Sequence, residues 1–428
     1  MIASFKPNLM KEHTAVKKEN IGEPEKSRVD YEALESWVRA RMQELIQDLL
    51  EEEVQELLGR QRYEHKKAVD AVNGYRNGYG KRRHLTLSCG TVELRRPRVR
   101  GLEQRFVSKI LPLFVRRTRE VADLLPELYL HGLAEGDFEL ALRGLLGEKA
   151  PLSGSTVARL KEKWQAEYNQ WKERSLKDLR IVYVWVDGLY VKAGLEKEKA
   201  AVLAMVASLS DGRKEILHLG SGYRESKESW AEVLRDLKKR GIEHIPLVVA
   251  DGHLGIWAAL PEVYPQTREQ RCWNHKEVNV LDQVPRTKQG EAKFLLTKIP
   301  YSRTRAEAEK ARDKFQAWCH QNGFAKAAEI LGADWERMVT FYSFPKEHWL
   351  HIRTTNVVES PFAALRLRTD AAKRFKKVEN ATAVIWKMLL IAEKRFRKLN
   401  APELLKEVYE GVEFVDGVAV TKKREAAA

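Results

Sequence analysis

Two short apolar segments that each end in Asp-Gly constrain the fold of this chain more than any other feature. The first is IVYVWVDG, residues 181–188, and the second is IPLVVADG, residues 245–252. Apolar runs of this length, rich in β-branched residues, are typical of strands buried on both faces. AAVLAMVASLS and KEILHLGSG predict two more strands between them, and SKESWAEVLRDLKKRG predicts a helix. The order strand, strand, strand, helix, strand predicts an α/β core.

Each Asp-Gly pair puts a carboxylate, Asp187 or Asp251, at the carboxyl end of a hydrophobic strand. Open α/β sheets bind their ligands at this end of their strands. In a mixed sheet whose first and fourth strands are neighbours, the two carboxylates would meet at one edge. The alternative is that each Asp is simply the turn residue of a D-G dipeptide. The occurrence of both at strand ends, in this order, favours a shared site.

Such a pair of acids needs a counter-charge. Two carboxylates brought together repel each other, and burying that charge unpaired costs several kcal/mol. A divalent cation removes this cost, and hard oxygen ligands suit Mg²⁺ or Mn²⁺. Two such ions about 4 Å apart activate an attacking oxygen and stabilise a leaving one during phosphodiester transfer. The acid pair therefore predicts a two-metal site that acts on a phosphodiester.

A third acid, Glu359, is the only acidic residue between Trp349 and Thr369. One interpretation is that it completes the metal site. The other is that it is a helix-start acid favoured by the helix dipole, with Asn356 as the N-cap of a capping box. Both interpretations can hold together. Pro361 restricts Glu359 to the first turn of a helix or to the residues just before it.

The charge of the whole chain points to a polyanion. Lysine and arginine number 76 against 61 aspartate and glutamate residues, which gives a net charge of +15. This excess favours nucleic acid as the partner, with an anionic membrane second. No apolar run approaches the roughly 20 residues that span a bilayer, and MIASFKPNLMKEH lacks the apolar stretch of a signal peptide. We expect a cytoplasmic, nucleoid-associated protein without membrane contact, and its three cysteines argue against a disulfide framework.

Basic residues gather in a few segments. Between Lys81 and Arg105, eight basic residues stand against two acidic ones in a turn-rich stretch, which favours an arm that follows a phosphate backbone over an ordinary solvated surface. Arg366, two turns beyond Glu359 on the same helix face, is expected to grip a phosphate. The predicted DNA-binding residues are Lys81, Arg82, Arg83, Arg95, Arg96, Arg98, Arg159, Lys161, Arg353, Arg366 and Arg368.

The N-terminal part of the chain is predicted to be mainly helical. An amphipathic helix begins at Asp30 and ends at Gly59, and its apolar stripe is either a dimer seam or packs against the chain's own next domain. Residues 117–173 predict further helices, the last of which is STVARLKEKWQAEYNQW. A helix, a glycine-bearing turn and a Ser/Thr-capped basic helix are typical of a helix-turn-helix, although any three-helix bundle looks similar.

Together these motifs resemble the mutator-type transposases of bacterial insertion sequences, from about residue 30 to residue 400. The motifs that carry the resemblance are VWVDG around Asp187, VVADG around Asp251, RCWNH at residues 271–275, FYSFPKEHWLHIRTTNVVESPFAALRLRT around Glu359, and the upstream RNGYGKRR and GTVELRRPRVRG.

The resemblance implies a DDE transposase with an RNase H-like catalytic domain, interrupted by a mostly helical insertion between Asp251 and Glu359. It implies that Asp187, Asp251 and Glu359 form the catalytic triad and bind two Mg²⁺ or Mn²⁺ ions. The activity implied is DNA strand cleavage and joining without a covalent protein intermediate, on the terminal inverted repeats of an element and on target DNA. Because two ends must be brought together, a homodimer or larger assembly is expected on DNA.

The predicted fold class is thus α/β, an RNase H-like mixed-sheet core with a helical insertion, preceded by mainly helical N-terminal DNA-binding regions. The predicted segments are a mobile arm (1–28), a helix with a basic DNA-contacting region (29–110), a helix-turn-helix-like domain (111–175), the first part of the core (176–280), the helical insertion (281–350), the last part of the core with Glu359 and basic helices (351–400), and a C-terminal tail (401–428).

Cys272 and His275 are also a feature of the resembled family. Two ligands at this spacing fall short of the four that a structural zinc site requires. A buried cysteine and a hydrogen-bonded histidine that fix the strand beside Asp251 are the favoured interpretation, with zinc as the alternative.

Two rival functions stay open at this point. A structure-selective nuclease of the same fold would cut DNA without joining it. A DNA-binding regulator would keep the fold without any chemistry. The three acids argue against the regulator, and the predicted DNA-binding segments favour recognition of specific ends, which a plain nuclease does not need.

Overall fold

The computed structural model describes residues 31, 33–65, 73–133, 142–143, 146, 154–193, 200–222, 226–252, 254–371, 375 and 377–420. The predicted arm, residues 1–28, and most of residues 134–153, in the middle of the predicted helical stretch 117–173, lie outside these residues, so the helix-turn-helix stays a prediction. The chain divides into two compact units, Met1–Thr118 with Arg143–Pro151, and Arg119–Leu142 with Leu152–Ala428.

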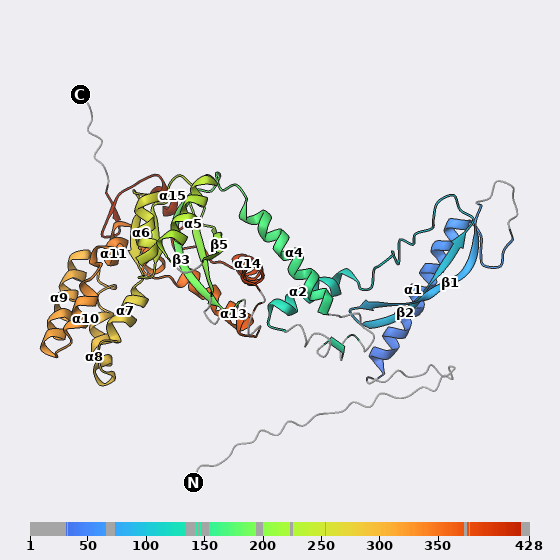
Figure 1. The fold of residues 1–428 in the computed structure, drawn as a ribbon, viewed down its shortest axis with the longest axis horizontal. Helices are drawn as coiled ribbons and strands as arrows, with labels where there is room; N and C mark the ends of the chain where they lie inside the picture. The colour runs from blue at the N-terminus through green and yellow to red at the C-terminus, as the bar shows by residue number, and fades with distance from the viewer. Residues whose placement is uncertain are drawn as a thin grey trace, which may run out of the picture. The chain divides into compact units, whose positions relative to one another are not determined.

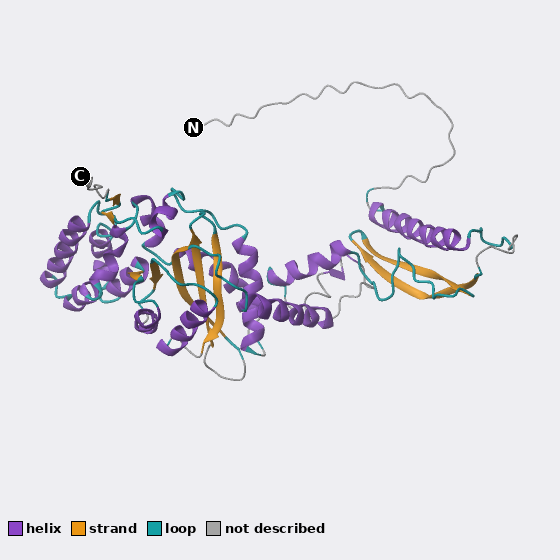
Figure 2. Cartoon of the chain, turned by 90° about the horizontal axis from the view of Figure 1, so that it is seen from above, coloured by secondary structure: helices purple, strands orange, loops and turns teal. Residues whose placement is uncertain are grey.

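The first unit combines one long helix with a β-hairpin (Figures 1 and 2). Helix α1 spans Leu34–Leu58 and ends at Gly59, whose φ of 64° is left-handed. Strand β1, Tyr75–Leu87, pairs with β2, Gly90–Arg100, in an antiparallel ladder that closes at Leu87 and Gly90. Alternate apolar residues of the two strands turn inward and form a core with α1 and the segment after the hairpin: Leu50, Leu85, Leu87, Val92, Leu94 and Leu111.

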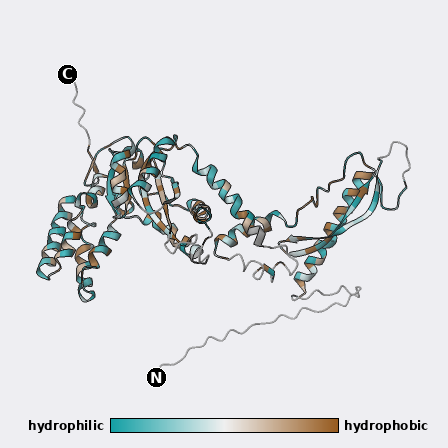
Figure 3. Cartoon of the chain, in the orientation of Figure 1, coloured by the Kyte–Doolittle hydropathy of each residue, from teal (hydrophilic) through white to brown (hydrophobic). Residues whose placement is uncertain are grey.

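This hairpin interrupts N-terminal regions whose other regular elements, where the structure describes them, are helices. The period of two in LTL and TVEL buries one face of each strand, which a helix cannot do with the same sequence. The apolar stripe of α1 is used in part by the same unit, because Leu50, Val54 and Leu58 are buried. Trp37 and Leu45 on the first half of the helix remain 45% and 53% exposed, and hydrophobic and hydrophilic residues both occur along α1 (Figure 3).

The second unit is built on a five-stranded mixed sheet, which confirms the predicted α/β core. Its strands are β3 (Ile181–Val191), β4 (Ala200–Leu209), β5 (Lys214–Gly222), β6 (Leu247–Ala250) and β7 (Arg268–Arg271), in the order β5-β4-β3-β6-β7. The pairs β3–β4 and β4–β5 are antiparallel, and the pairs β3–β6 and β6–β7 are parallel. The first and fourth strands of the core are therefore neighbours, as predicted.

Helices cover this sheet and bury a continuous core. Ser226 caps α5, Lys227–Lys239, by accepting a hydrogen bond from the Ser229 N–H, and the apolar face of α5 packs with α6, Leu254–Val263, against the strands. Further helices of this unit in the described residues are α2 (Arg119–Leu130), α4 (Gly154–Lys172), α13 (Asn356–Ala371), α14 (Val378–Glu393) and α15 (Leu404–Tyr409).

Between β7 and α13 the chain is helical. This stretch contains α7 (Trp273–Leu281), α8 (Arg286–Leu296), α9 (Arg305–Gln321), α10 (Ala325–Gly332), α11 (Trp335–Val339), η1 (Thr340–Ser343), η2 (Lys346–His348) and α12 (Trp349–Ile352). The C-terminal segment, predicted as a tail, is folded as far as residue 420: β8 (Phe414–Val415) pairs with β9 (Val418–Ala419). It docks through the Gly417 N–H, which donates to Tyr342 O, and through the buried Leu405 and Phe414.

Among the described residues, every helix is too short or too polar to cross a bilayer.

Candidate active site

The sheet register places Asp187 and Asp251 next to each other. The last parallel pair of β3 and β6 joins Val186 to Ala250, and the two acids follow it directly. Strand β3 does not end at Asp187, as the sequence predicted; it continues to Val191 because its second half still pairs with β4, where Asp187 lies opposite Ala204. The two carboxylates therefore emerge where the pairing between β3 and β6 stops.

Both acids are fixed locally by the glycine that follows them. Asp187 Oδ1 accepts a hydrogen bond of 2.8 Å from the Gly188 N–H, and Asp251 Oδ1 accepts one from the Gly252 N–H. A side chain at Gly252 would collide with the guanidinium of Arg271, which an ion pair of 2.8 Å to Asp334 holds in place. The glycine of this Asp-Gly pair is thus needed for close packing.

Glu359 reaches the same edge from the first turn of α13. This helix begins at Asn356, so Thr355 rather than Asn356 is its N-cap, and the Thr355 carbonyl accepts from the Glu359 N–H at 3.0 Å. Asn356 instead accepts a hydrogen bond of 2.9 Å from Asn274. Pro361 lies inside α13, which it does not break. The Thr355 hydroxyl donates to Glu359 Oε1 and so orients the carboxylate.

Cys272 joins the strand of Asp251 to the helix of Glu359. It follows β7, is fully buried, and its N–H donates to Ala250 O at 2.8 Å. Its sulfur accepts from the Thr355 N–H at 3.3 Å and lies 3.1 Å from Thr355 Oγ1. A thiol thus contacts the residue that orients Glu359. Thr355 was missed by the sequence reasoning, although its position four residues before Glu359 places both on one helix face.

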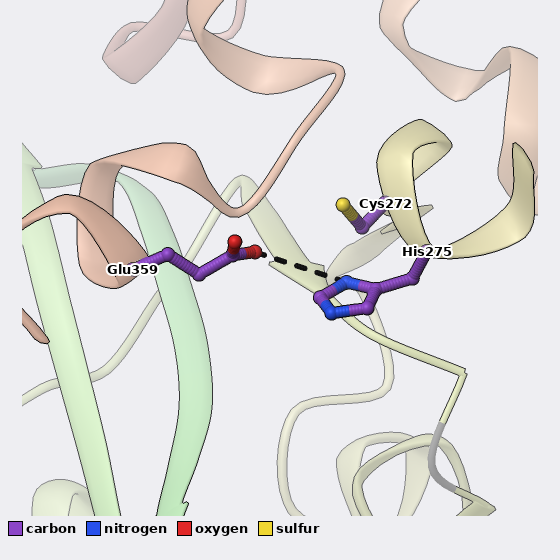
Figure 4. Close-up of side chains that lie close together, drawn as sticks. All are labelled: Cys272, His275 and Glu359. Atoms are coloured by element: carbon purple, nitrogen blue, oxygen red, sulfur yellow. Dashed lines mark ion pairs between the residues drawn. The ribbon is translucent and has the colours of Figure 1, made fainter. Parts of the chain in front are cut away.

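His275, on the first turn of α7, points toward Glu359 (Figure 4) and also lies close to Asp251. Its Nδ1 is 3.7 Å from Asp251 Oδ1 and 3.8 Å from Glu359 Oε1. A hydrogen bond to Cys272 raises the pKa of His275 and burial opposes that rise. The negative charges of Asp251 and Glu359 also raise it, so that the pKa is about 9. The imidazolium is therefore a cation beside two carboxylates.

The ligand atoms of Cys272, His275 and Glu359 all lie within 4.8 Å of one another. In the described part of the chain no fourth His, Cys, Asp or Glu joins this group, so four-coordinate zinc is incomplete there. The other two cysteines are Cys89, which is half-buried, and Cys319, which is buried. The position of Cys272 suits a structural link between β6, α7 and α13.

The predicted DNA-binding residues divide into exposed and internal side chains. Arg353 is only 8% exposed, and its guanidinium donates to the carbonyls of Trp349 and Pro300. These bonds stabilise the turn before α13, so we correct the prediction that Arg353 contacts DNA. Arg83 similarly donates to the carbonyls of Pro112 and Val115.

Other residues of this set remain at the surface. Arg82 is paired with Glu93 at 2.9 Å, and Lys161 Nζ lies 5.3 Å from the centre of the Tyr129 ring. The side chain of Arg368 is outside the described residues. The predicted residues whose side chains are exposed are Lys81, Arg82, Arg95, Arg98, Arg159 and Arg366, whereas Arg96 is half-buried.

Comparison with known proteins gives a consistent family. The model of the family described as "Transposase, Mutator family" matches residues 11–398. The transposase for insertion sequence element IS6120 of Mycolicibacterium smegmatis is 41% identical over 297 residues, 69% of this chain and 92% of that protein. The transposase for IST2 of Acidithiobacillus ferrooxidans is 41% identical over 65% of this chain and 94% of that protein, and the one for ISRM5 of Rhizobium meliloti is 28% identical over 85% and 89%.

Among solved structures, the Drosophila P element transposase strand transfer complex aligns with 67% of this chain and 84% of that chain, at 12% identity. The TM-score of this alignment is 0.27.

Proposed function

This chain belongs to the Mutator family of transposases, and we propose that it moves an insertion sequence by cutting and joining DNA at a site made by Asp187, Asp251 and Glu359. One observation carries the proposal. Asp251 and Glu359 are 108 residues apart in sequence, yet both carboxylates approach the same nitrogen of His275, at 3.7 and 3.8 Å. Asp187 is adjacent to Asp251 in the sheet register.

The donor set fits a hard divalent cation. Carboxylates that converge repel one another, and the position of His275 between Asp251 and Glu359 supports a need for positive charge at this edge. Oxygen ligands of this kind suit Mg²⁺ or Mn²⁺. When bound, two such ions would supply Lewis-acid stabilisation of the attacking and leaving oxygens of a phosphodiester.

The chain's own residues position these carboxylates. The Thr355 hydroxyl has one proton to donate, and the Glu359 carboxylate is the strongest acceptor near it. The hydroxyl therefore donates its hydrogen bond to Glu359. Cys272 in turn contacts Thr355 and bonds to the strand end before Asp251. The positions of Glu359 and Asp251 are thereby coupled through Thr355 and Cys272. This coupling supports a geometry suited to a shared ligand.

We assign to the central sheet an RNase H-like arrangement. The order β5-β4-β3-β6-β7, with β4 antiparallel to both neighbours and acids on β3 and after β6, supports this assignment. The helical stretch between β7 and α13 corresponds to the predicted insertion. The DNA would be the terminal inverted repeats and the target, bound by at least two copies of the chain on the nucleoid.

The test is strand transfer by the purified protein. Duplex DNA of its own element's end is incubated with Mg²⁺ or Mn²⁺, and nicked and joined products are separated on a denaturing gel. Asp251→Asn removes a proposed metal ligand, and Asp178→Asn makes the same charge change at an exposed residue away from the sheet edge. We expect joined products from the wild type and Asp178→Asn, and none from Asp251→Asn or after chelation with EDTA.

The other outcomes separate the rival functions. Cleavage without joining, lost in Asp251→Asn, would assign a nuclease. DNA binding without chemistry under either metal would assign a regulator. Joined products that persist in Asp251→Asn would exclude the proposed acids.

A further inference from the structure

A cavity of about 500 Å³ lies beside the first turn of α13 and is distinct from the acid site. Its walls come from the end of α2, the start of β5, α13, and α14 with the segment that follows it. We call it the α13–α14 pocket, and its lining is Leu130, His131, Lys214, Val357, Ser360, Pro361, Met388, Ile391, Ala392, Arg395, Phe396 and Arg397. The volume is within the range of about 300–1,000 Å³ typical of small-molecule sites.

The pocket combines an apolar lining with positive charge. Seven of its twelve lining residues are apolar, three are lysine or arginine, and none is acidic. The arginines flank the one phenylalanine of the lining in the triplet Arg395-Phe396-Arg397. In the part of the chain that the structure describes, neither guanidinium is paired with a carboxylate. Such a lining fits a flat apolar group that carries a negative charge.

Lys214 brings the third cation to the pocket. Its Nζ donates to the Arg397 carbonyl at 2.7 Å and lies 5.9 Å from the centre of the Trp185 ring. Burial lowers the pKa of Lys214 to about 8, as expected where an ammonium loses hydration without full compensation by a counter-charge. An anion near the Lys214 ammonium and the two guanidiniums would provide that compensation.

The pocket and the acid site share one turn of α13. Glu359 faces His275, whereas the neighbouring Val357 and Pro361 line the pocket. Residues two positions away on an α-helix are turned by about 200°, so these two side chains leave the helix on the side opposite Glu359. A ligand in the pocket would thus contact the same helical turn that carries the acid.

From these features we propose that the α13–α14 pocket binds a single nucleotide unstacked from the DNA substrate, with its base against Phe396 and its phosphate at Arg395, Arg397 and Lys214. This inference rests on the proposed function, because it takes DNA to be the substrate at Glu359. Bases stack on aromatic side chains whatever their sequence, and arginines bind phosphate with fork geometry. The pocket offers both within one triplet.

The experiment uses end DNA in which 2-aminopurine replaces one base at a time, because this analogue fluoresces when it leaves the stack. Fluorescence is read without divalent metal, so no cleavage is needed, and binding is measured separately by anisotropy. We expect one position to brighten severalfold with the wild type. Phe396→Leu, which keeps an apolar side chain of similar size, should abolish the brightening and weaken DNA binding by about tenfold.

Arg395→Gln, at an exposed residue, tests the phosphate contact, and Arg303→Gln makes the same charge change at an exposed position outside the pocket. Loss of the signal in Arg395→Gln and its retention in Arg303→Gln would support the proposal. Binding with no bright position, or equal brightening by Phe396→Leu, would overturn it and leave the proposed function untouched. A change of oligomeric state in Phe396→Leu, with no fluorescence difference, would assign the pocket to a protein contact and overturn it as well. If the protein does not bind end DNA at all, the proposed function itself is contradicted.

Discussion

The edge of the central sheet and the β1–β2 hairpin hold their charged side chains in different ways. At the sheet edge the carboxylates are short and follow paired backbone, so the register of β3 and β6 fixes where Asp187 and Asp251 emerge. On the hairpin the long side chains of arginine reach over several ångströms and take different partners. Arg83 bonds to two backbone carbonyls, whereas Arg95 remains exposed. The positions of the short aspartate side chains are thus set by the sheet topology. The positions of the long arginine side chains are set by the hydrogen-bond acceptors that the tertiary fold brings near them.

The same contrast recurs around Glu359. Arg353 and Arg366 stand on either side of it in sequence, but the first is buried on the carbonyls of Trp349 and Pro300 and the second is exposed on α13. One arginine is therefore expected to stabilise the fold and the other to contact DNA. Four substitutions test this contrast between acids positioned by the sheet or helix that carries them and arginines whose role depends on tertiary contacts.

The largest effect is expected at Glu359. Glu359→Gln keeps an oxygen that accepts from Thr355 but removes the charge that would bind metal. Metal stabilisation of a phosphoryl transition state is worth several kcal/mol, so strand transfer should fall by about a thousandfold. A gel assay of joined products measures this, with Glu379→Gln on the exposed start of α14 as the matched control. Activity within a few-fold of wild type would remove Glu359 from the site.

Arg353→Met should mainly affect stability. It leaves the carbonyls of Trp349 and Pro300 without their donor inside the protein. The free energy of unfolding is expected to fall by about 3 kcal/mol, measured by urea titration. The salt dependence of DNA binding should not change. An unaltered urea midpoint would contradict the internal role of this arginine.

Thr355→Val tests how firmly the acid is positioned. The substitution keeps the shape of the side chain but removes the hydroxyl that orients Glu359. Strand transfer is expected to fall by about tenfold, which corresponds to the roughly 1.4 kcal/mol of one hydrogen bond to a charged group. The Mg²⁺ concentration for half-maximal activity should rise, and Thr355→Ser should restore both values. An effect on thermal stability alone would reduce Thr355 to a helix cap.

The smallest effect is expected at Arg366. Removing one phosphate contact with Arg366→Gln should weaken binding to all DNA sequences alike and reduce the slope of log affinity against log salt by about 1. Urea stability should stay at the wild-type value, in contrast to Arg353→Met. Anisotropy titrations at several salt concentrations give the slope. An unchanged slope would show that this exposed arginine lies outside the DNA path.

Much of the acid site was predictable because its parts are local. The composition of the apolar segments predicts buried strands, and each Asp-Gly marks the place where the pairing of β3 with β6 stops. The order of the elements made β3 and β6 plausible neighbours. The extension of β3 to Val191 was not predictable, since it depends on pairing with β4. Thr355 was missed because its value lies in contacts to Cys272 and Glu359 that only the packing of α13 creates.

By itself, the sequence determined the family and the α/β core, and it supplied the proposal of the three acids, because strand composition and short motifs can be recognised without knowledge of long-range contacts. Tertiary structure alone decided that the β1–β2 hairpin packs on α1, that Arg353 and Arg83 point to backbone carbonyls, and that His275 lies between Asp251 and Glu359. The physical reason is the length of the side chains and their dependence on packing. The position of a carboxylate on a strand follows from the position of the strand. An arginine, a histidine on a helix or an amphipathic stripe acquires its role only from the surface that packs against it.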